Sequence, residues 1–128
     1  MKFFFDNNLA LKIAKGLNGF VAPDHKVTHL RERFEAGADD IEWMRGLAKE
    51  EDWIIVTADL NIGKNPHEIA AWKEAGHTIF FLKRGWLNLS FWEQAHKFTK
   101  CFPQIIEKAK TARRGSSFIV SVNGKIEG

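Results

Sequence analysis

The 128-residue sequence contains a single cysteine, Cys101, so no disulfide can form within the chain. No group of cysteines and histidines has the spacing of a structural zinc site. No apolar run approaches the roughly 20 residues that span a bilayer, and Asp6 interrupts the apolar start too early for a secretory signal. We therefore expect a cytoplasmic protein that has no membrane segment.

Two catalytic motifs are also missing. There is no Gly-x-Ser-x-Gly motif for a nucleophilic serine, and Gly63-Lys64 lacks both the upstream glycine and the following Ser or Thr of a phosphate loop. Repeats, linkers and low-complexity segments are absent as well. Because 45% of the residues are hydrophobic, enough to fill one core, the sequence predicts a single domain over residues 1–128.

The formal net charge of +3 is compatible with a polyanionic partner such as RNA. Acidic residues concentrate between Glu32 and Asp59, whereas basic residues dominate the C-terminal half. The basic residues of that half include Lys83, Arg84, Lys97, Lys100, Lys108, Lys110, Arg113 and Arg114. An acidic site flanked by basic surface suits a metal-dependent phosphodiesterase.

Hydrophobic periodicity predicts strands that alternate with helices. The predicted strands cover residues 3–5, 27–30, 53–56, 78–82 and 118–122, and the predicted helices begin at Asn8, Asp39, Pro66 and Phe91. Such alternation favours an α/β fold with a mainly parallel central sheet and helices on both faces. In these folds the functional site lies beyond the carboxyl ends of the strands.

Two aspartates follow predicted strands. Asp6 ends the first strand, and Asp59 comes just after the strand 53–56. If these strands are neighbours, two carboxylates converge, and their mutual repulsion favours a bound cation. Mg²⁺ and Mn²⁺ prefer such oxygen ligands. The alternative is that each aspartate merely caps a helix or forms an Asx-turn.

A third group of acids opens the helix that precedes the strand 53–56. Asp39 and Glu42 have the spacing of a capping box, which leaves Asp40 without a structural task. We therefore take Asp40 as the third metal-ligand candidate and Glu42 as the fourth acid. Glu68 is best explained as the capping partner of Asn65.

Three polar residues are candidates for supporting roles. Thr57 is placed to hydrogen-bond a carboxylate and fix its rotamer, although threonine is common at strand ends. Asn7 is placed to orient Asp6 or a metal-bound water, while Asn8 is expected to cap the first helix. Lys64 is a candidate phosphate contact, and the simpler interpretation is a solvated lysine.

The order and spacing of these segments resemble a bacterial PIN-like domain family from Met1 to about Lys110. The segments that carry the resemblance are Met1–Leu9, Asp40–Trp43, Thr57–Asp59, Asn65-Pro66, Phe80–Leu82, Gly85–Leu89 and Phe91–Glu93. The resemblance implies a three-layer α/β/α PIN-like fold and kinship with the toxin ribonucleases of toxin-antitoxin pairs. Those enzymes bind Mg or Mn through clustered acids and hydrolyse RNA.

The resemblance extends to individual acids. Asp6 matches the first-strand aspartate, Asp40 the acid that opens a later helix, and Asp59 the acid after the Thr-x-Asp strand end. PIN nucleases typically carry a further glutamate on an early helix, and residues 8–19 contain none. Either Glu42 substitutes for it or the site is incomplete.

The leading hypothesis is therefore a metal-dependent endoribonuclease, the toxin of a toxin-antitoxin pair, with an antitoxin as its protein partner. The alternative is a catalytically inactive PIN-like module that binds RNA or a protein. A third hypothesis is a receiver-like phosphoacceptor with Asp59 as acceptor and Lys83 as its cation, although Asp6 lacks the second acid that such sites carry. A small open sheet and several large aromatic residues also suggest a homodimer.

Overall fold

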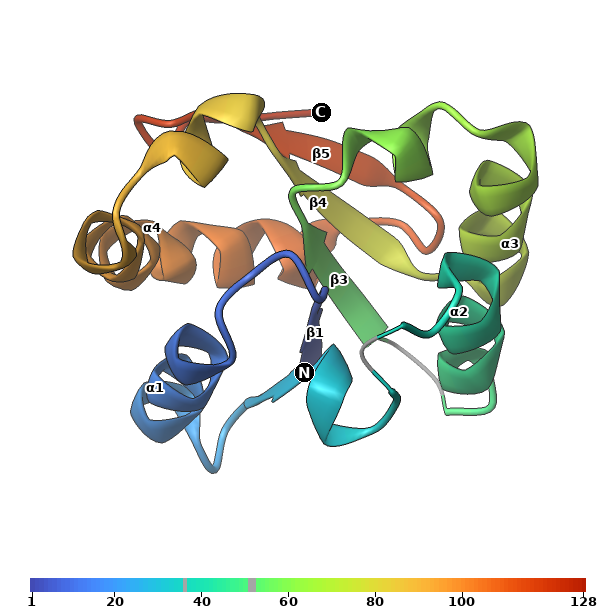
Figure 1. The fold of residues 1–128 in the computed structure, drawn as a ribbon, viewed down its shortest axis with the longest axis horizontal. Coiled ribbons are helices and arrows are strands. Elements are labelled where there is room, and N and C mark those ends of the chain that lie inside the picture. The colour runs from blue at the N-terminus through green and yellow to red at the C-terminus, as the bar shows by residue number, and fades with distance from the viewer. Residues whose placement is uncertain (36, 51–52) are drawn as a thin grey trace.

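The computed structural model describes residues 1–35, 37–50 and 53–128, which form a six-stranded sheet between two layers of helices (Figure 1). The strand order is β2-β1-β3-β4-β5-β6. The strands are β1 (Lys2–Phe5), β2 (Lys26–His29), β3 (Trp53–Thr57), β4 (Thr78–Leu82), β5 (Ser117–Val120) and β6 (Ile126–Glu127). The predicted α/β fold with a mainly parallel sheet is confirmed.

Strand direction brings the ends of five strands together. All neighbouring strands run parallel except β5 and β6, which are antiparallel. Strand β1 lies between β2 and β3, so that Phe5 is opposite both His29 and Val56. We call the edge where β1 to β5 end the carboxyl edge. Residues that follow adjacent strands are about 4.8 Å apart along this edge.

The helices cover both faces of the sheet. They are α1 (Leu11–Val21), α2 (Asp40–Ala48), α3 (Pro66–Ala75) and α4 (Phe91–Thr111), with short 3-10 helices η1 (Leu30–Glu32), η2 (Leu60–Gly63) and η3 (Arg84–Asn88). Helices α1 and α4 pack on the face that carries Phe3 and Phe5, whereas α2 and α3 pack on the face that carries Phe4. Because both faces of the sheet are buried, the residues Phe3–Phe5 of β1 form an unbroken apolar run in the sequence.

Most of the large aromatic side chains belong to these two cores. Phe4 stacks on Trp43 with ring centroids 5.0 Å apart, and Trp86 packs on Phe98 at 4.7 Å. Each such side chain contributes roughly 1.5–3 kcal/mol on burial. Phe20, Phe91 and Trp92 are exceptions with exposed rings, and Trp92 has 79% of its surface exposed.

Two predicted helix starts are confirmed. The side chain of Asn65 caps α3 by accepting the His67 amide at 2.9 Å, and Pro66 occupies the first turn. Ser90 and Glu93 form the capping box of α4. Helix α3 ends at Gly76, whose φ of 76° lies in the left-handed region that glycine favours.

Three predicted caps are wrong. Helix α1 begins after Ala10, and Asn8 instead accepts the Ala58 amide at 3.4 Å, which ties the end of β1 to the end of β3. Asp39 precedes α2 but makes no side-chain capping bond to any described residue. Glu68 does not close a capping box with Asn65, because a different carboxyl group holds it, as shown below.

The C-terminal strand is shorter than predicted. Strand β5 ends at Val120, and a turn then leads to the unpredicted two-residue strand β6. Gly124 in this turn has a φ of 90°, in the left-handed region that glycine favours. None of the described helices is both long enough and apolar enough to cross a membrane.

Candidate metal centre at the carboxyl edge

Three aspartates from different elements meet at the carboxyl edge. Asp6 follows β1, Asp59 lies two residues beyond the end of the adjacent β3, and Asp40 is the first residue of α2. One carboxylate oxygen from each of the three lies within 4.8 Å of the others. The three acids that the sequence singles out as metal ligands are therefore brought into one cluster.

Asp6 is the buried member of this cluster, with 5% of its surface exposed. Its Oδ2 accepts the Thr57 hydroxyl at 2.8 Å, and its Oδ1 accepts the Asn7 amide at 2.6 Å. Burial is the main cause that raises the pKa of Asp6 to about 6; repulsion from Asp40 and Asp59 adds to it, and the two hydrogen bonds oppose it. A bound cation would relieve this unfavourable charge.

The other two aspartates are oriented by hydrogen bonds from neighbouring N–H groups. Oδ1 of Asp40 accepts the Trp43 indole N–H at 3.0 Å, one turn along α2. Oδ1 of Asp59 accepts the Asn61 amide at 3.0 Å, in the Asx-turn that the simpler interpretation predicts. An ionised carboxylate offers about four lone-pair sites, so these bonds orient the aspartates and leave acceptor sites for a cation.

Thr57 connects two of the aspartates. Besides donating to Asp6, its hydroxyl oxygen accepts the backbone amide of Asp59 at 3.0 Å. The side chain is fully buried, so water does not compete for these bonds. The expected hydrogen bond between Thr57 and a carboxylate is therefore present.

Glu68, in the first turn of α3, is a fourth acid beside the cluster. Its side chain hydrogen-bonds Asp40. Partial burial is the largest cause that raises the pKa of Glu68 to about 7, followed by this bond and by repulsion from Asp40 and Asp59. With a pKa of about 7, the Glu68 carboxyl group is partly protonated near neutral pH and can donate a hydrogen bond to a neighbouring carboxylate.

A polar hollow of about 560 Å³ opens beside these acids. Asp40, Asp59, Glu68, Asn61 and Lys64 are among the residues that line it. The exposed Lys64 lies on the wall of this hollow, and its role as a phosphate contact stays a prediction. The hollow provides room beside the carboxylates for a polar ligand.

Glu42 does not join the cluster. Its exposed side chain borders a separate hollow that Phe34 and Gly37 also line. The reason is helical geometry, because residues two apart on a helix face different directions. The structure thus does not support Glu42 as a substitute for the missing early-helix glutamate.

Sequence reasoning missed Glu68 and Trp43. Topology could have indicated Glu68. Helix α3 begins at the carboxyl edge, where Asp59 lies, so an acid in its first turn must lie near that edge. The capping-box pattern accounted for Glu68 and concealed this signal. The ring of Trp43 is buried in the core, and its N–H also holds Asp40.

Comparison with known proteins gives one family match. A family model described as "PIN like domain" matches residues 1–84. No curated protein and no solved structure matches the chain. The matched span contains all four clustered acids, and the fold agrees with the three-layer α/β/α architecture that the resemblance implies.

Proposed function

Because the chain belongs to the PIN-like domain family, which points to a nuclease-type protein, we propose that it is a metal-dependent endoribonuclease. In this proposal Asp6, Asp40 and Asp59 hold Mg²⁺ or Mn²⁺. The observation that carries it is the meeting of three carboxylate oxygens within 4.8 Å. Such a concentration of negative charge, with one member buried, is stabilised by a divalent cation.

The donor set fits Mg²⁺ or Mn²⁺. All three donors are carboxylate oxygens, which hard divalent cations prefer. Ligand oxygens of an octahedral Mg²⁺ are about 3 Å apart on neighbouring positions and about 4 Å apart on opposite ones, so the three aspartates would draw together around the ion. A divalent cation would generate a nucleophile from water at neutral pH and neutralise charge on the phosphodiester.

The surrounding residues have distinct tasks in this proposal. Thr57 and Trp43 hold Asp6 and Asp40 in fixed orientations, which reduces the cost of arranging the ligands. Lys64, on the wall of the hollow, contacts the phosphate of the substrate. Glu68 supplies the fourth carboxyl group that PIN nucleases typically carry on an early helix.

Further parts of the proposal concern the whole chain. We treat residues 1–128 as one PIN-like domain. This is supported by β5, which lies outside the matched span but pairs with β4 in the same sheet. The toxin role, an antitoxin partner and the cytoplasmic location stay predictions. The exposed rings of Phe20 and Trp92 support a homodimer, which analytical ultracentrifugation tests.

The test is cleavage of a mixed-sequence RNA with and without Mn²⁺. We expect wild-type protein to cleave only with the metal, and Asp6→Asn and Asp59→Asn to lose both cleavage and calorimetric Mn²⁺ binding. Asp24→Asn, which alters an exposed aspartate in the turn before β2, is the matched control. Unchanged cleavage by Asp6→Asn would exclude the proposed site. Carboxylate-dependent Mn²⁺ binding without cleavage of any RNA would favour the inactive module.

A further inference from the structure

Basic residues continue the carboxyl edge beyond the acids. Thr57 of β3 is opposite Phe81 of β4. Asp59 lies two residues after Thr57, and Lys83 lies two residues after Phe81. Lys83 and Arg84 are exposed, and neither forms an ion pair within the part of the chain that the structure describes. Positive charge therefore follows β4, the strand next to the one that leads to Asp59.

The segment that carries Lys83 and Arg84 packs tightly on the end of β5 and on the turn that follows it. The Lys83 amide donates to the Val120 carbonyl at 2.9 Å, and the Trp86 indole donates to the Ser121 carbonyl at 3.0 Å. At Gly85 the approach is so close that an added Cβ would lie 2.4 Å from Val122 Cγ2. Helix η3 and the turn between β5 and β6 thus form one continuous surface.

That turn in turn contacts α4. An added Cβ at Gly124 would lie 3.3 Å from the Cβ of Cys101. Between α4 and the turn runs a groove of about 400 Å³. Its lining includes Lys97, Lys100 and Lys125, together with the polar side chains of His96, Gln104 and Asn123.

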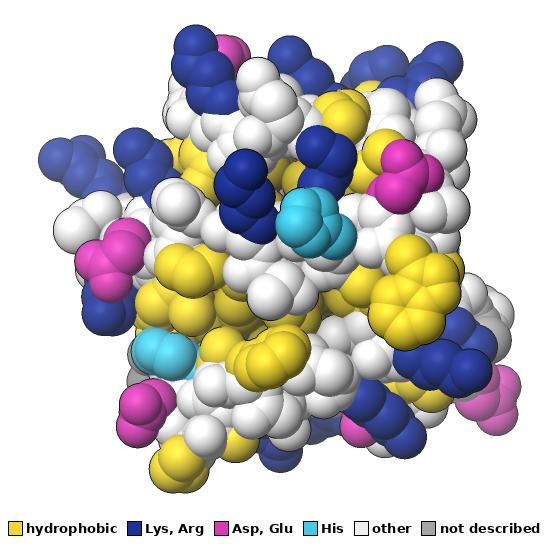
Figure 2. All heavy atoms as spheres, turned by 90° about the vertical axis from the view of Figure 1, so that its left-hand side faces the viewer, with side chains coloured by type: hydrophobic (Ala, Val, Ile, Leu, Met, Phe, Trp, Pro, Cys, Tyr) yellow, Lys and Arg dark blue, Asp and Glu magenta, His cyan; other side chains and the backbone are white. Residues whose placement is uncertain are grey.

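Two cations of this groove form no ion pair within the described part of the chain. Lys97 and Lys100 lie one helical turn apart and make no ion pair with any described residue, whereas Lys125 pairs with Glu127 at 3.5 Å. Glu93, on the turn of α4 before Lys97, uses its carboxylate to accept the Ser90 amide. Figure 2 shows Lys and Arg side chains gathered along the upper part of this side of the molecule, with few acids among them.

We propose that single-stranded RNA runs from the acidic cluster past Lys83 and Arg84 into the groove beside Lys97 and Lys100. This path rests on the proposed nuclease function and names its substrate-binding surface. A chain of phosphates fits a path that begins at a phosphodiester-cleaving site and continues over spaced cations that are not held in ion pairs. An acidic protein segment would match the cations but not the acids at the start of the path.

The path favours single-stranded over double-stranded RNA because it crosses from one face of the sheet to the other. The acids lie beside α2 and α3, whereas the groove lies beside α4, which covers the opposite face of the sheet. The chain of nucleotides must therefore bend over the carboxyl edge. A duplex is too stiff to bend over so short a distance, while a single strand bends freely.

The test uses the double charge reversal Lys97→Glu/Lys100→Glu in the full chain. Binding of a fluorescent single-stranded RNA of about 12 nucleotides is measured by anisotropy in EDTA, so that no cleavage occurs. We expect affinity to fall roughly tenfold or more, and the slope of log K against log salt to become shallower by about 1.4, or about 0.7 for each lost phosphate contact.

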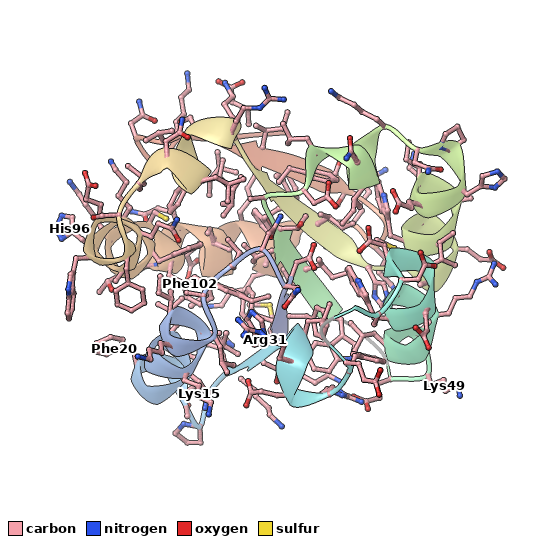
Figure 3. All side chains as sticks on the ribbon, in the orientation of Figure 1. Lys15, Phe20, Arg31, Lys49, His96 and Phe102 are labelled. Atoms are coloured by element: carbon pink, nitrogen blue, oxygen red, sulfur yellow. The ribbon has the colours of Figure 1, made fainter. Side chains whose placement is uncertain are left out.

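The matched control is Lys15→Glu/Lys49→Glu, which changes the net charge equally. Figure 3 shows both lysines at the end of the molecule opposite η3. We expect this control to keep most of the wild-type affinity and salt slope. Equal losses in the two double variants would overturn the path, as would tighter binding of an acidic peptide than of RNA at the groove.

A second readout separates this inference from the function on which it rests. Cleavage of a dinucleotide, which is too short to reach the groove, should be the same in wild-type protein and in Lys97→Glu/Lys100→Glu. Absence of RNA cleavage by wild-type protein would count against the nuclease, and the anisotropy comparison would still decide the path. Reduced dinucleotide cleavage in the double variant would show that the two lysines act on the acidic site itself and would overturn the path.

Discussion

The hydroxyl of Thr57 donates to Oδ2 of Asp6 at 2.8 Å and accepts the amide of Asp59 at 3.0 Å. One buried side chain at the end of β3 thus fixes a carboxylate on the neighbouring strand and the turn that carries a second carboxylate. Because both bonds are shielded from water, losing the hydroxyl should disturb the ligand geometry more than the fold.

Thr57→Val tests this role, since valine keeps the shape of threonine and removes only the hydroxyl. We expect Mn²⁺ affinity, measured by calorimetry, to fall about tenfold or more, the effect typical of losing a group that orients a metal ligand. Thr57→Ser keeps the hydroxyl and should bind Mn²⁺ nearly as well as wild type. If the valine variant loses stability but binds Mn²⁺ normally, Thr57 is structural only.

The buried charge of Asp6 predicts a pH dependence of the metal-free protein. Folding raises the pKa of Asp6 from 3.8 to about 6, so the folded state binds this proton more tightly than the unfolded state. The resulting stabilisation is complete below the unfolded pKa and is lost as the pH rises through about 6. The full difference corresponds to at most about 3 kcal/mol.

The measurement compares the thermal unfolding of wild-type protein and Asp6→Asn in EDTA between pH 5 and 7.5. Buried His29 and His77, whose pKa values are lowered mainly by burial, titrate in both proteins and cancel in the difference. We expect Asp6→Asn to gain stability relative to wild type as the pH rises. A difference that does not change with pH would mean that burial does not penalise the Asp6 carboxylate.

Glu68 and Glu42 offer a direct comparison between the site in the structure and the site expected from sequence. Glu68→Gln removes a charge that repels Asp40 and Asp59, and its amide can still donate to Asp40. We expect this variant to keep or increase the stability of the metal-free protein and to weaken Mn²⁺ binding several-fold, because the cluster loses negative charge.

Glu42→Gln should leave Mn²⁺ binding unchanged, because Glu42 borders a different hollow. Glu74→Gln, an exposed change on the same helix as Glu68, serves as the control for altered net charge. Calorimetry on the three variants decides the assignment. Weaker binding in Glu42→Gln than in Glu68→Gln would reverse our identification of the fourth acid.

The sequence predicts the aspartates of the site because their positions follow from topology. Asp6 and Asp59 end neighbouring parallel strands, and Asp40 opens the helix that leads to β3. Parallel strands bring such residues to one edge regardless of side-chain detail. The same alternation of elements was sufficient to predict the layered fold.

The rest depends on side-chain choices that local patterns do not fix. Glu68 has the spacing of a capping partner for Asn65, but in the folded protein it hydrogen-bonds Asp40, which is distant in sequence. Asn8 resembles a helix cap and instead holds the Ala58 amide. In both cases a long-range partner replaces a local one, and a single sequence does not reveal that competition.

Gly85 gives the last prediction, because it joins η3 to the turn that carries the basic groove. A methyl group added there would lie 2.4 Å from Val122 Cγ2, closer than two non-bonded carbon atoms can approach without a shift. Gly85→Ala should therefore lower the free energy of unfolding by about 1–3 kcal/mol, the usual cost of overpacking. Val122→Ala removes the opposing methyl groups, so the double variant should lose less than the sum of the two single changes. Urea unfolding of the four proteins measures this coupling, and additive losses would show that the two segments do not depend on each other.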